Sequence, residues 1–556
     1  MSMMLEHSLA LMVVSPITAA LIIKLLSRFE HPDEIRDIVT FTGLLLPLIL
    51  LLFTSRRAEI VYEMGGWVRP YGISLVLDGL SRAMVLITGV VTLSTYVYYV
   101  DFLDQDPRGD DYHFFYLFMT AGIYGVFLTG DLVNRFIFFE ITILTTYVLL
   151  TFIGTKESLK ASFRYFIMGT IASLMYLTGI GLTYFYTGYL DLEALSRTVP
   201  LLSPSTRNII FVFFLIAVGI KLGIMPFHTW LPDAHVEAPT PMTAIMAGIT
   251  VKTGGYIMLK FYKIGFQTLE IQYFFVALGI FTALFGALLS LKYMNMKKIL
   301  AWLTISHMGV IAIMFSLWTP GSLAAGLLYF INHSFYKALL FLSVGAFAYI
   351  YGTSDIRKLP LLKSNVILSS SFLIGLLALI GVPPMNGFYS RWLIFSVLEN
   401  PVLLVVMILT GVLTSASVIR MFLLSSRENR PKRNDLTEGM MAPLIVLAGL
   451  TSFGGLSTSI FLGNIIDPAV ASIFGTETGL MTSGIGMGAI SSFYGILVLF
   501  TIVAGLLLLL PLKIKSISSP WMEYRFSKVT IRDSVRYVIY ALAFFLLLNF
   551  LYGGIG

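Results

Sequence analysis

Several ionisable residues of this chain lie inside long apolar runs, where a charge has no water to solvate it. Glu140 lies in FIFFEITILTTYVLL, Lys221 in AVGIKLGIMP and Lys252 in MTAIMAGITVKTGGYIML. A lysine in a hydrocarbon layer costs at least about 2.5 kcal/mol, so each is a candidate functional residue. The structural alternatives are a Glu140 neutralised by burial or bonded to a hydroxyl such as Thr145, and a Lys221 that snorkels to a headgroup.

The second half of the chain carries a similar set. His307 lies in ILAWLTISHMGVIAI, and Arg391 lies in GFYSRWLIF. His333 and Lys337, in LLYFINHSFYKALLFL, are four residues apart and therefore share one face of a helix. Two adjoining proton-binding groups in one apolar helix favour a relay. A hydrogen-bonded core histidine is the alternative for His307, and a position near the membrane interface is the alternative for Arg391.

The chemistry that such a row of groups can perform is the transfer of protons or cations. A Glu–Lys pair about 4 Å apart, at an effective dielectric of 20, is worth roughly 4 kcal/mol. Making or breaking the pair therefore decides whether the lysine keeps its proton, and the next lysine responds to that change. By contrast, Lys260, Lys263, Arg420 and Lys513 fall at the ends of predicted spans, and we interpret them as snorkelling anchors.

Composition places these residues in a membrane. Apolar residues make up 57% of the 556 residues and charged residues only 12%, with repeated apolar runs long enough to cross a bilayer. The polar stretches between the runs are short connections, which excludes an extramembrane catalytic or nucleotide-binding unit in this chain. The N-terminal run is interpreted as a retained first span, because it lacks a basic start and a small-residue cleavage site. The sequence predicts an all-α polytopic membrane protein.

The chain has no cysteine, which excludes thiolate-bound iron–sulfur clusters, cysteine-ligated zinc and disulfides. Its deeper histidines, His228, His235, His307 and His333, form no obvious metal or haem set. We therefore expect no cofactor and no metal, and no electron transfer by this chain itself. The net charge of +7 is dispersed over short loops, so membrane topology explains it and a nucleic-acid partner is not expected.

The apolar runs predict about sixteen spans, near 8–26, 38–54, 74–100, 113–129, 131–153, 164–187, 208–229, 241–262, 272–291, 297–317, 322–350, 365–396, 401–424, 440–463, 488–511 and 533–552. Loops after odd-numbered spans hold most of the lysine and arginine: Lys156, Lys160, Arg164, Lys292, Lys297, Lys298, Arg357, Lys358, Lys363, Arg427, Arg430, Lys432 and Arg433. The positive-inside rule then places these loops in the cytoplasm and both termini outside the plasma membrane.

Two proline-containing breaks suggest an internal repeat. Pro226 interrupts one apolar run, and Pro383 with Pro384 interrupts another, so each run is predicted to be a broken helix with freed carbonyls. Glu140 precedes Lys221 by 81 residues (221 − 140), and His307 precedes Arg391 by 84 (391 − 307). This near-equal spacing fits two repeats, inverted if each holds five spans. Proline kinks that arose independently are the alternative.

Five stretches carry a resemblance to a known family: GDLVNRFIFFE (130–140), GIKLGIMPFHTWLPDAHVEAPTP (219–241), VKTGGY (251–256), NHSFYKALLFL (332–342) and GVPPMNGFYS (381–390). They resemble the antiporter-like, proton-translocating subunits of complex I. The similarity is greatest to D-type subunits of Mrp sodium/proton antiporters and to the equivalent subunits of archaeal membrane-bound hydrogenases and sulfur reductases. The resemblance covers about residues 75–460, and its WLPDAH…APTP stretch is highly specific.

The resemblance implies a core of fourteen helices in two inverted five-helix repeats, broken in the seventh and twelfth spans. It implies that Glu140 pairs with Lys221, that Lys252 is the central relay, and that His307, His333 and Lys337 connect the halves across the midplane. Arg391 stands at the exit position of the second half, where the family usually has lysine. Because arginine keeps its proton, this position either tunes Lys337 as a fixed charge or belongs to a sodium-conducting half-channel.

The predicted organisation is then N-terminal transmembrane helices (1–112), a first antiporter repeat (113–262), a second repeat (272–424), and C-terminal helices with a basic amphipathic linker (440–556). The expected function is translocation of protons, with or without sodium exchange, as one subunit of an Mrp-type or complex I-related oxidoreductase complex. Expected partners are other membrane subunits, either with or without a peripheral hydrogenase or reductase arm. The alternatives are an inactive scaffold that anchors a redox module and a stand-alone sodium/proton antiporter.

Overall fold

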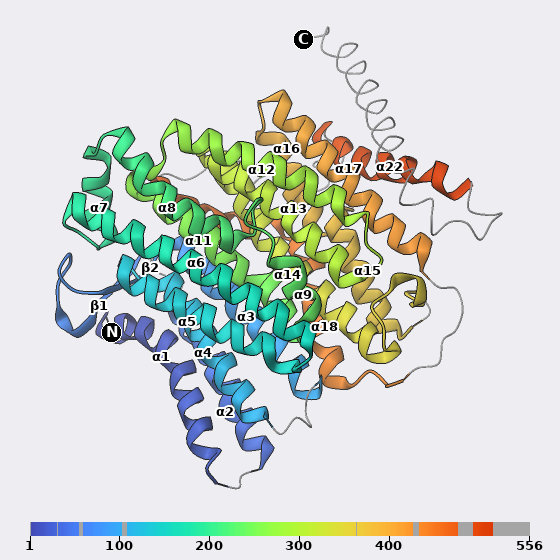
Figure 1. Cartoon of the computed structure of the whole chain (residues 1–556), viewed down its shortest axis with the longest axis horizontal. Coiled ribbons are helices and arrows are strands. Elements are labelled where there is room, and N and C mark those ends of the chain that lie inside the picture. The colour runs from blue at the N-terminus through green and yellow to red at the C-terminus, as the bar shows by residue number, and fades with distance from the viewer. Residues whose placement is uncertain are drawn as a thin grey trace.

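The computed structural model describes residues 2–29, 32–54, 59–102, 108–362, 364–425, 433–475 and 493–514, and these form a bundle of long, roughly aligned helices (Figure 1). Helices dominate because a lipid-embedded chain must satisfy its backbone hydrogen bonds within each segment. The N-terminal helices are α1 (Ser2–Leu26), α2 (Asp33–Thr54) and α3 (Gly79–Phe102). They confirm the first three predicted spans, except that the third begins later than expected.

The first half of the predicted core contains the helices from residue 109 to residue 266. They are α4 (Gly109–Leu128), α5 (Leu132–Leu150), α6 (Lys156–Thr187), α7 (Leu192–Thr198), α8 (Pro204–Leu222), α9 (Leu231–Glu237), α10 (Thr240–Ile245) and α11 (Val251–Phe261). Two π-helical turns, η4 (Met246–Thr250) and η5 (Tyr262–Phe266), extend the last of these at either end.

The second half of the predicted core follows with α12 (Leu269–Ser290), α13 (Met296–Ser316), α14 (Pro320–Tyr351), α15 (Val366–Ile380), α16 (Asn386–Val397) and α17 (Pro401–Leu424). The C-terminal helices within the described residues are α18 (Glu438–Leu456), α19 (Thr458–Phe461), α20 (Asp467–Phe474) and α22 (Phe493–Ile514). The predicted last span, 533–552, and the rest of the basic linker lie outside the described residues.

Twelve helices of the described residues are long and apolar enough to cross a membrane, which confirms a polytopic all-α protein. Of the other predicted spans, span 113–129 corresponds to α4, span 365–396 to α15 with α16, and span 488–511 to α22. The central helix is α14, which packs against α10, α13, α15, α16 and α18. The inverted relation between the two halves stays a prediction.

Both proline breaks occur where the sequence predicts them. The first separates α8 from α9 between Leu222 and Leu231, and the second separates α15 from α16 between Ile380 and Asn386. Each preceding helix ends on a left-handed glycine, Gly223 (φ 70°) or Gly381 (φ 82°), a conformation that glycine adopts without steric cost.

A small antiparallel hairpin was not expected from the apolar pattern. Strands β1 (Ile60–Glu63) and β2 (Ser74–Leu77) pair with Ile60 opposite Leu77, and β2 continues into a bridge between Leu75 and Thr129. The prediction of a helix from residue 74 is therefore wrong by five residues, because Asp78 starts α3 by accepting a hydrogen bond from the Ser81 amide at 2.9 Å. The hairpin lies over the end of the bundle that also carries α7 (Figure 1).

Candidate functional site

The first predicted pair lies between α5, α6 and α8. Glu140 projects from α5, and its Oε1 atom is buried without a hydrogen-bond partner among the described residues. Lys221, on the last turn of α8, is 4% exposed and lies within electrostatic range of Glu140. The structure thus brings together the carboxylate and the lysine that the sequence pairs. Among the described residues, the two side chains do not form a direct ion pair.

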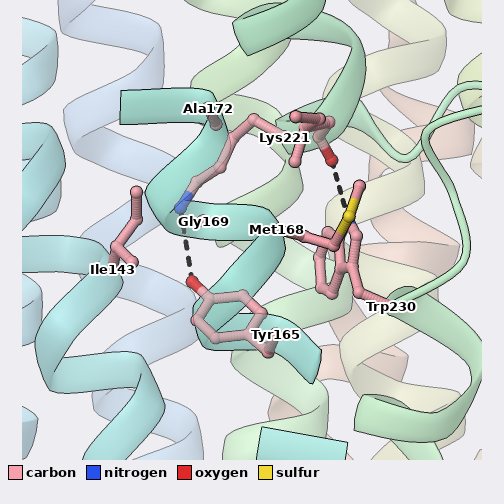
Figure 2. Close-up of a pocket in the computed structure, with 8 residues that line it drawn as sticks. Ile143, Tyr165, Met168, Gly169, Ala172, Lys221 and Trp230 are labelled. Atoms are coloured by element: carbon pink, nitrogen blue, oxygen red, sulfur yellow. Dashed lines mark hydrogen bonds between the residues drawn. The ribbon is translucent and has the colours of Figure 1, made fainter. Parts of the chain in front are cut away.

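Tyr165 on α6 is the hydrogen-bond partner of Lys221. The Lys221 ammonium donates to the Tyr165 hydroxyl at 3.5 Å (Figure 2). It also lies 5.0 Å from the centre of the ring of Phe139, the residue before Glu140. Aromatic faces stabilise a desolvated ammonium through their negative quadrupole. The lysine is therefore held by neutral groups, and Glu140 acts on it through space.

A small cavity adjoins this lysine. Its walls include Lys221, Tyr165, Trp230 and Gly169, and its volume of about 10 Å³ is close to the space that one water molecule needs. The lysine chain passes along the cavity and points at the hydroxyl in Figure 2. One water in this position would have polar partners in the ammonium and the phenol.

Lys252 begins the second cluster, at the point where a π-helical turn interrupts the helix. Its side chain is fully buried, and its ammonium donates to the carbonyl of Ala247, which belongs to that turn. π-turns leave the usual helical hydrogen bonds unmade and occur frequently at functional sites. Here the turn supplies an acceptor to a lysine that is fully enclosed by protein.

His333 on α14 is the second partner of Lys252. The Lys252 Nζ atom and the His333 Nδ1 atom are 2.7 Å apart, although the two residues are 81 positions apart in the chain. The ring centroids of His333 and His307 lie 5.4 Å apart, and Nε2 of each histidine lacks a partner within the described residues. Lys252 therefore contacts His333 at Nδ1, while Nε2 of each of the two imidazoles is left available for a further proton transfer.

Lys337 and Arg391 complete the set in the second half. Lys337 is fully buried and donates to the Leu300 carbonyl of α13 at 3.0 Å. Arg391 on α16 donates to the Leu379 carbonyl of α15 at 3.0 Å, and its charge acts on Tyr329, Tyr336 and His307. The Tyr336 hydroxyl lies 3.5 Å from His307 Nδ1, so tyrosines lie between the arginine and the histidines.

Close helix packing joins the two clusters. A side chain at Gly254 on α11 would place its Cβ 3.2 Å from the Lys221 Cβ and 3.0 Å from the Leu222 amide nitrogen of α8. On another face, Gly248 approaches the backbone carbonyl of Ser334, the residue after His333. Glycine therefore lets α8, α11 and α14 approach closely enough for their lysines and histidines to form one row.

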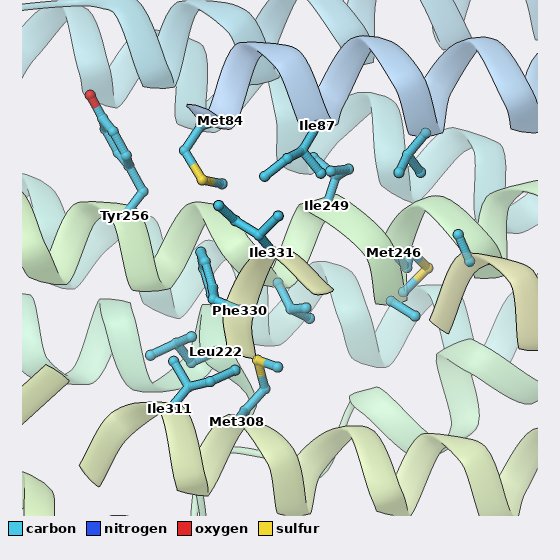
Figure 3. Packing of buried hydrophobic residues seen from close by; sticks show 14 of the residues in the cluster. Met84, Ile87, Leu222, Met246, Ile249, Tyr256, Met308, Ile311, Phe330 and Ile331 are labelled. Carbon is cyan, nitrogen blue, oxygen red and sulfur yellow. The ribbon is translucent and has the colours of Figure 1, made fainter. Parts of the chain in front are cut away.

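Apolar side chains enclose this row. Met246 and Ile249 from the π-turn, Phe330 and Ile331 from α14, and Met308 from α13 are all buried, and Figure 3 shows several of them packed between the helices. Such a surrounding excludes bulk water and lowers the local dielectric. Charge changes in the row are consequently felt more strongly by neighbouring groups than they would be in water.

Sequence reasoning missed two residues of the site. Tyr165 carries no charge in its apolar run and gives no signal. His235 on α9 is fully buried, stacks on Phe341 at 5.0 Å, has no hydrogen-bond partner for either ring nitrogen among the described residues, and lies within electrostatic range of Lys252, Lys297 and Lys337. Its position in the specific WLPDAH stretch was the signal that could have identified it.

Two of the predicted membrane anchors are buried instead. Lys260 is 6% exposed and forms an ion pair with Asp78, with Nζ and Oδ2 2.5 Å apart. Arg420 is 7% exposed and donates to the Tyr293 carbonyl at 3.0 Å. The interpretation as snorkelling anchors is wrong for both, because each finds a polar partner within the protein. Lys263 is exposed, as expected, and the side chain of Lys513 lies outside the described residues.

The arrangement can move protons between neighbouring amines, imidazoles and hydroxyls. Within the described ranges, no group of three or more His, Asp or Glu side chains is placed to hold a metal ion. Comparisons with known proteins agree on a membrane family. A family model described as NADH:quinone oxidoreductase/Mrp antiporter, TM, matches residues 129–417.

Individual relatives are similar over most of their length. The chain is 30% identical over 429 residues to the D-type subunit of the Na(+)/H(+) antiporter of Alkalihalophilus pseudofirmus, covering 74% of this chain and 86% of the relative. It is 28% identical over 508 residues to the N-type subunit of the NADH-quinone oxidoreductase of Desulforudis audaxviator, covering 84% and 99%. A chain of the archaeal membrane-bound sulfane sulfur reductase shares its fold, with a TM-score of 0.78 at 24% identity over 84% of this chain and 97% of that one.

Proposed function

Because the chain belongs to the NADH:quinone oxidoreductase/Mrp antiporter family of membrane subunits, we propose that it translocates protons along the buried row from Glu140 to Arg391. The observation that carries the proposal is the 2.7 Å contact between Lys252 and His333. It joins an amine from the first half of the chain to an imidazole from the second. A proton can pass along this hydrogen bond without a large movement of either helix.

Glu140 and Lys221 act as the switch of this row. When Glu140 is ionised it favours the charged form of Lys221, and when it is protonated that stabilisation is lost. Lys221 then transfers its proton to the Lys252 side of the site, where neutral histidines accept it. Glu140, Lys221, Lys252, His307, His333 and Lys337 are the proton carriers in this proposal. Arg391 keeps its charge and tunes the tyrosines and histidines beside it.

The direct test is Glu140→Gln in the intact host complex reconstituted into vesicles, with ion uptake followed by a pH-sensitive dye. We expect uptake to fall about 100-fold, the lower end of the range for a positioned proton-transfer group. Glu157→Gln is the matched control, because Glu157 is exposed at the start of α6. Wild-type uptake by the Glu140 variant would support the scaffold alternative and contradict the proposal.

The relatives are named as subunits, and we infer that this chain also works among other membrane subunits in the plasma membrane. Extraction in mild detergent followed by mass spectrometry identifies them. If hydrogenase-like or reductase-like subunits co-purify, redox chemistry in those partner subunits drives the translocation. Only small antiporter subunits would indicate exchange of protons for sodium driven by the ion gradient, and transport by the purified single chain would indicate a stand-alone antiporter.

A further inference from the structure

One face of α11 carries a ladder of polar groups that begins at Lys252 of the proposed row and continues to two residues that the row does not use. Lys252, Tyr256 and Lys260 follow one another at intervals of four residues and so share a face. Their exposed fractions are 0%, 1% and 6%, and the separation of eight positions between Lys252 and Lys260 corresponds to a rise of about 12 Å along the helix. The ladder therefore leads from the central lysine to the end of the bundle that carries the β-hairpin and α7.

Asp78 closes this ladder with both of its carboxylate oxygens engaged. Oδ1 accepts hydrogen bonds from the amide and hydroxyl of Ser81 and so starts α3, whereas Oδ2 lies 2.5 Å from Lys260 Nζ and 4.0 Å from Lys263 Nζ. Burial alone would raise the pKa of the Asp78 carboxyl, but the two lysines and the bonds from Lys260 and Ser81 hold it at about 2. Asp78 is therefore a fixed negative charge beside Lys260.

The ladder ends at an open cavity of 260 Å³, large enough for several water molecules. Its walls come from β2, the turn between α4 and α5, α7 and α11. The charged side chains that line it are Glu59, Arg69, Asp78, Asp191, Glu193, Lys260 and Lys263. Arg69 pairs with Glu193 at 2.9 Å and Asp191 at 3.7 Å, and an arginine keeps its proton, so the two lysines are the cations of this cavity whose chemistry permits proton release.

Lys252 thus lies between two carboxylate–lysine pairs. On one side are Glu140 and Lys221, and on the other are Asp78 and Lys260. The carboxylates differ in their contacts: within the described part of the chain Glu140 has a buried oxygen without a hydrogen-bond partner, whereas Asp78 is bonded at both oxygens. The first pair can change charge, and the second can attract and hold an ammonium.

We propose that Lys260, held by Asp78, is a proton-release site through which the first half of the chain delivers hydronium to the water of this cavity. The proposal rests on the proton translocation proposed above. Lys260 starts as the ammonium that is paired with Asp78, and one of its N–H bonds breaks as that proton passes to cavity water. The amine left beside Asp78 then accepts a proton that the Lys252 ammonium has released along the ladder, which restores the ion pair. Asp78 remains a carboxylate throughout.

Lys260→Arg separates this role from that of a structural ion pair. Arginine keeps the charge and the bond to Asp78 but does not release its proton. In vesicles containing the intact complex, we expect proton uptake to fall at least tenfold while the thermal unfolding temperature of the complex stays near that of the wild type. Wild-type uptake by Lys260→Arg would overturn the proposal, because a purely structural ion pair with Asp78 requires only the positive charge.

Asp78→Asn is the complementary variant, since asparagine also caps helices and can still accept from the Ser81 amide. It removes the charge that attracts the Lys260 proton, so we expect uptake to fall about tenfold. If Glu140→Gln abolishes uptake but both variants of the Asp78–Lys260 pair are active, only the release site is wrong. If all of them are active, proton translocation by this chain is wrong as well.

The natural absence of cysteine allows a test that does not depend on any buried residue. Ser196 lines the cavity, whereas Ser205 is exposed at the start of α8 and does not line it. A membrane-impermeant, positively charged thiol reagent should block uptake by Ser196→Cys and leave Ser205→Cys active. Full labelling of Ser196→Cys with unchanged uptake would contradict release through this cavity.

Discussion

The lysines of the row are held by neutral partners. Lys221 donates to a phenol, Lys252 to an imidazole and a carbonyl, and Lys337 to a carbonyl. A direct bond to a carboxylate would favour the charged form of such a lysine by several kcal/mol at an effective dielectric of about 20. Neutral acceptors leave both protonation states accessible, so the charge of each lysine can follow that of its neighbour.

Tyr165→Phe tests the partner of Lys221. The change removes only the hydroxyl and keeps the ring against Trp230, whose centroid lies 5.1 Å away. A weak bond to a charged group is worth about 1 kcal/mol, which corresponds to a roughly five-fold slower uptake. Tyr147→Phe is the matched control on α5. Equal uptake by the two variants would show that the hydroxyl does not take part in proton transfer.

His333→Leu tests the contact between the two halves. The leucine cannot accept the proton of Lys252, so we expect uptake to fall about 100-fold, as for loss of a positioned proton acceptor. His113→Gln is the control. It removes another buried histidine, which is not part of the row and forms a 2.8 Å hydrogen bond with Thr40. It should lower the unfolding temperature and spare transport. Comparable losses of uptake in both variants would point to misfolding rather than to a relay.

The sequence identifies a buried charge more readily than its partner. Glu140 and Lys252 stand out because no other ionisable residue lies near them in an apolar run. The prediction for Lys260 was wrong because its partner Asp78 is 182 residues away in the sequence. Without that partner, the position of Lys260 near the end of a predicted span was the only guide to its exposure. Tyr165 gave no signal at all, since a tyrosine in a membrane helix needs no partner to be tolerated.

At the scale of the helices, both breaks are spanned by a side chain from beyond the break. The Trp230 indole donates to the Ile220 carbonyl of α8 at 2.8 Å, and the Arg391 guanidinium donates to the Leu379 carbonyl of α15 at 3.0 Å. Carbonyls freed by a break inside a membrane need such donors. This gives the Arg391 side chain a polar partner within the fold at residue 391.

Trp230→Phe should loosen the first break. The Ile220 carbonyl loses its indole donor and keeps the bond from the Gly223 amide at 3.1 Å, and the loss of one hydrogen bond costs about 1 kcal/mol. We expect a lower thermal unfolding temperature in detergent and faster proteolysis between α8 and α9. Trp302→Phe is the matched control, because the Trp302 indole nitrogen has no hydrogen-bond partner among the described residues. If both variants lose equal stability, the ring and not the hydrogen bond supports the break.

The helices and their breaks were predictable because their causes are local. Apolar length fixes each span, and proline with a left-handed glycine fixes each break. The hairpin of β1 and β2 was not predictable, since Ser74–Leu77 reads as the start of an apolar helix until Asp78 is recognised as its cap. The π-turn before Lys252 likewise leaves no trace in the hydropathy pattern, because its residues Met246–Thr250 also suit an α-helix.

At the scale of the whole molecule, the basic loops gather at one end. Asp233 contacts Arg164 of α6 and lies 3.9 Å from Lys298 of α13, and Asn295 bridges Asp355 in the next predicted inner loop. The opposite end carries the β-hairpin, α7 and the release cavity (Figure 1). The positive-inside rule therefore predicts that the basic end faces the cytoplasm and that the cavity opens on the outer face.

This orientation is testable with single cysteines in the naturally cysteine-free chain. Lys160→Cys lies exposed near the start of α6 at the basic end, and Ser205→Cys lies exposed at the start of α8 at the opposite end. In intact cells, an impermeant thiol reagent should label the Ser205 variant and spare the Lys160 variant until the membrane is permeabilised. The reverse pattern would place the cavity in the cytoplasm. Lys260 would then lie on the side from which protons are taken up, and the direction of transfer along α11 would be inverted.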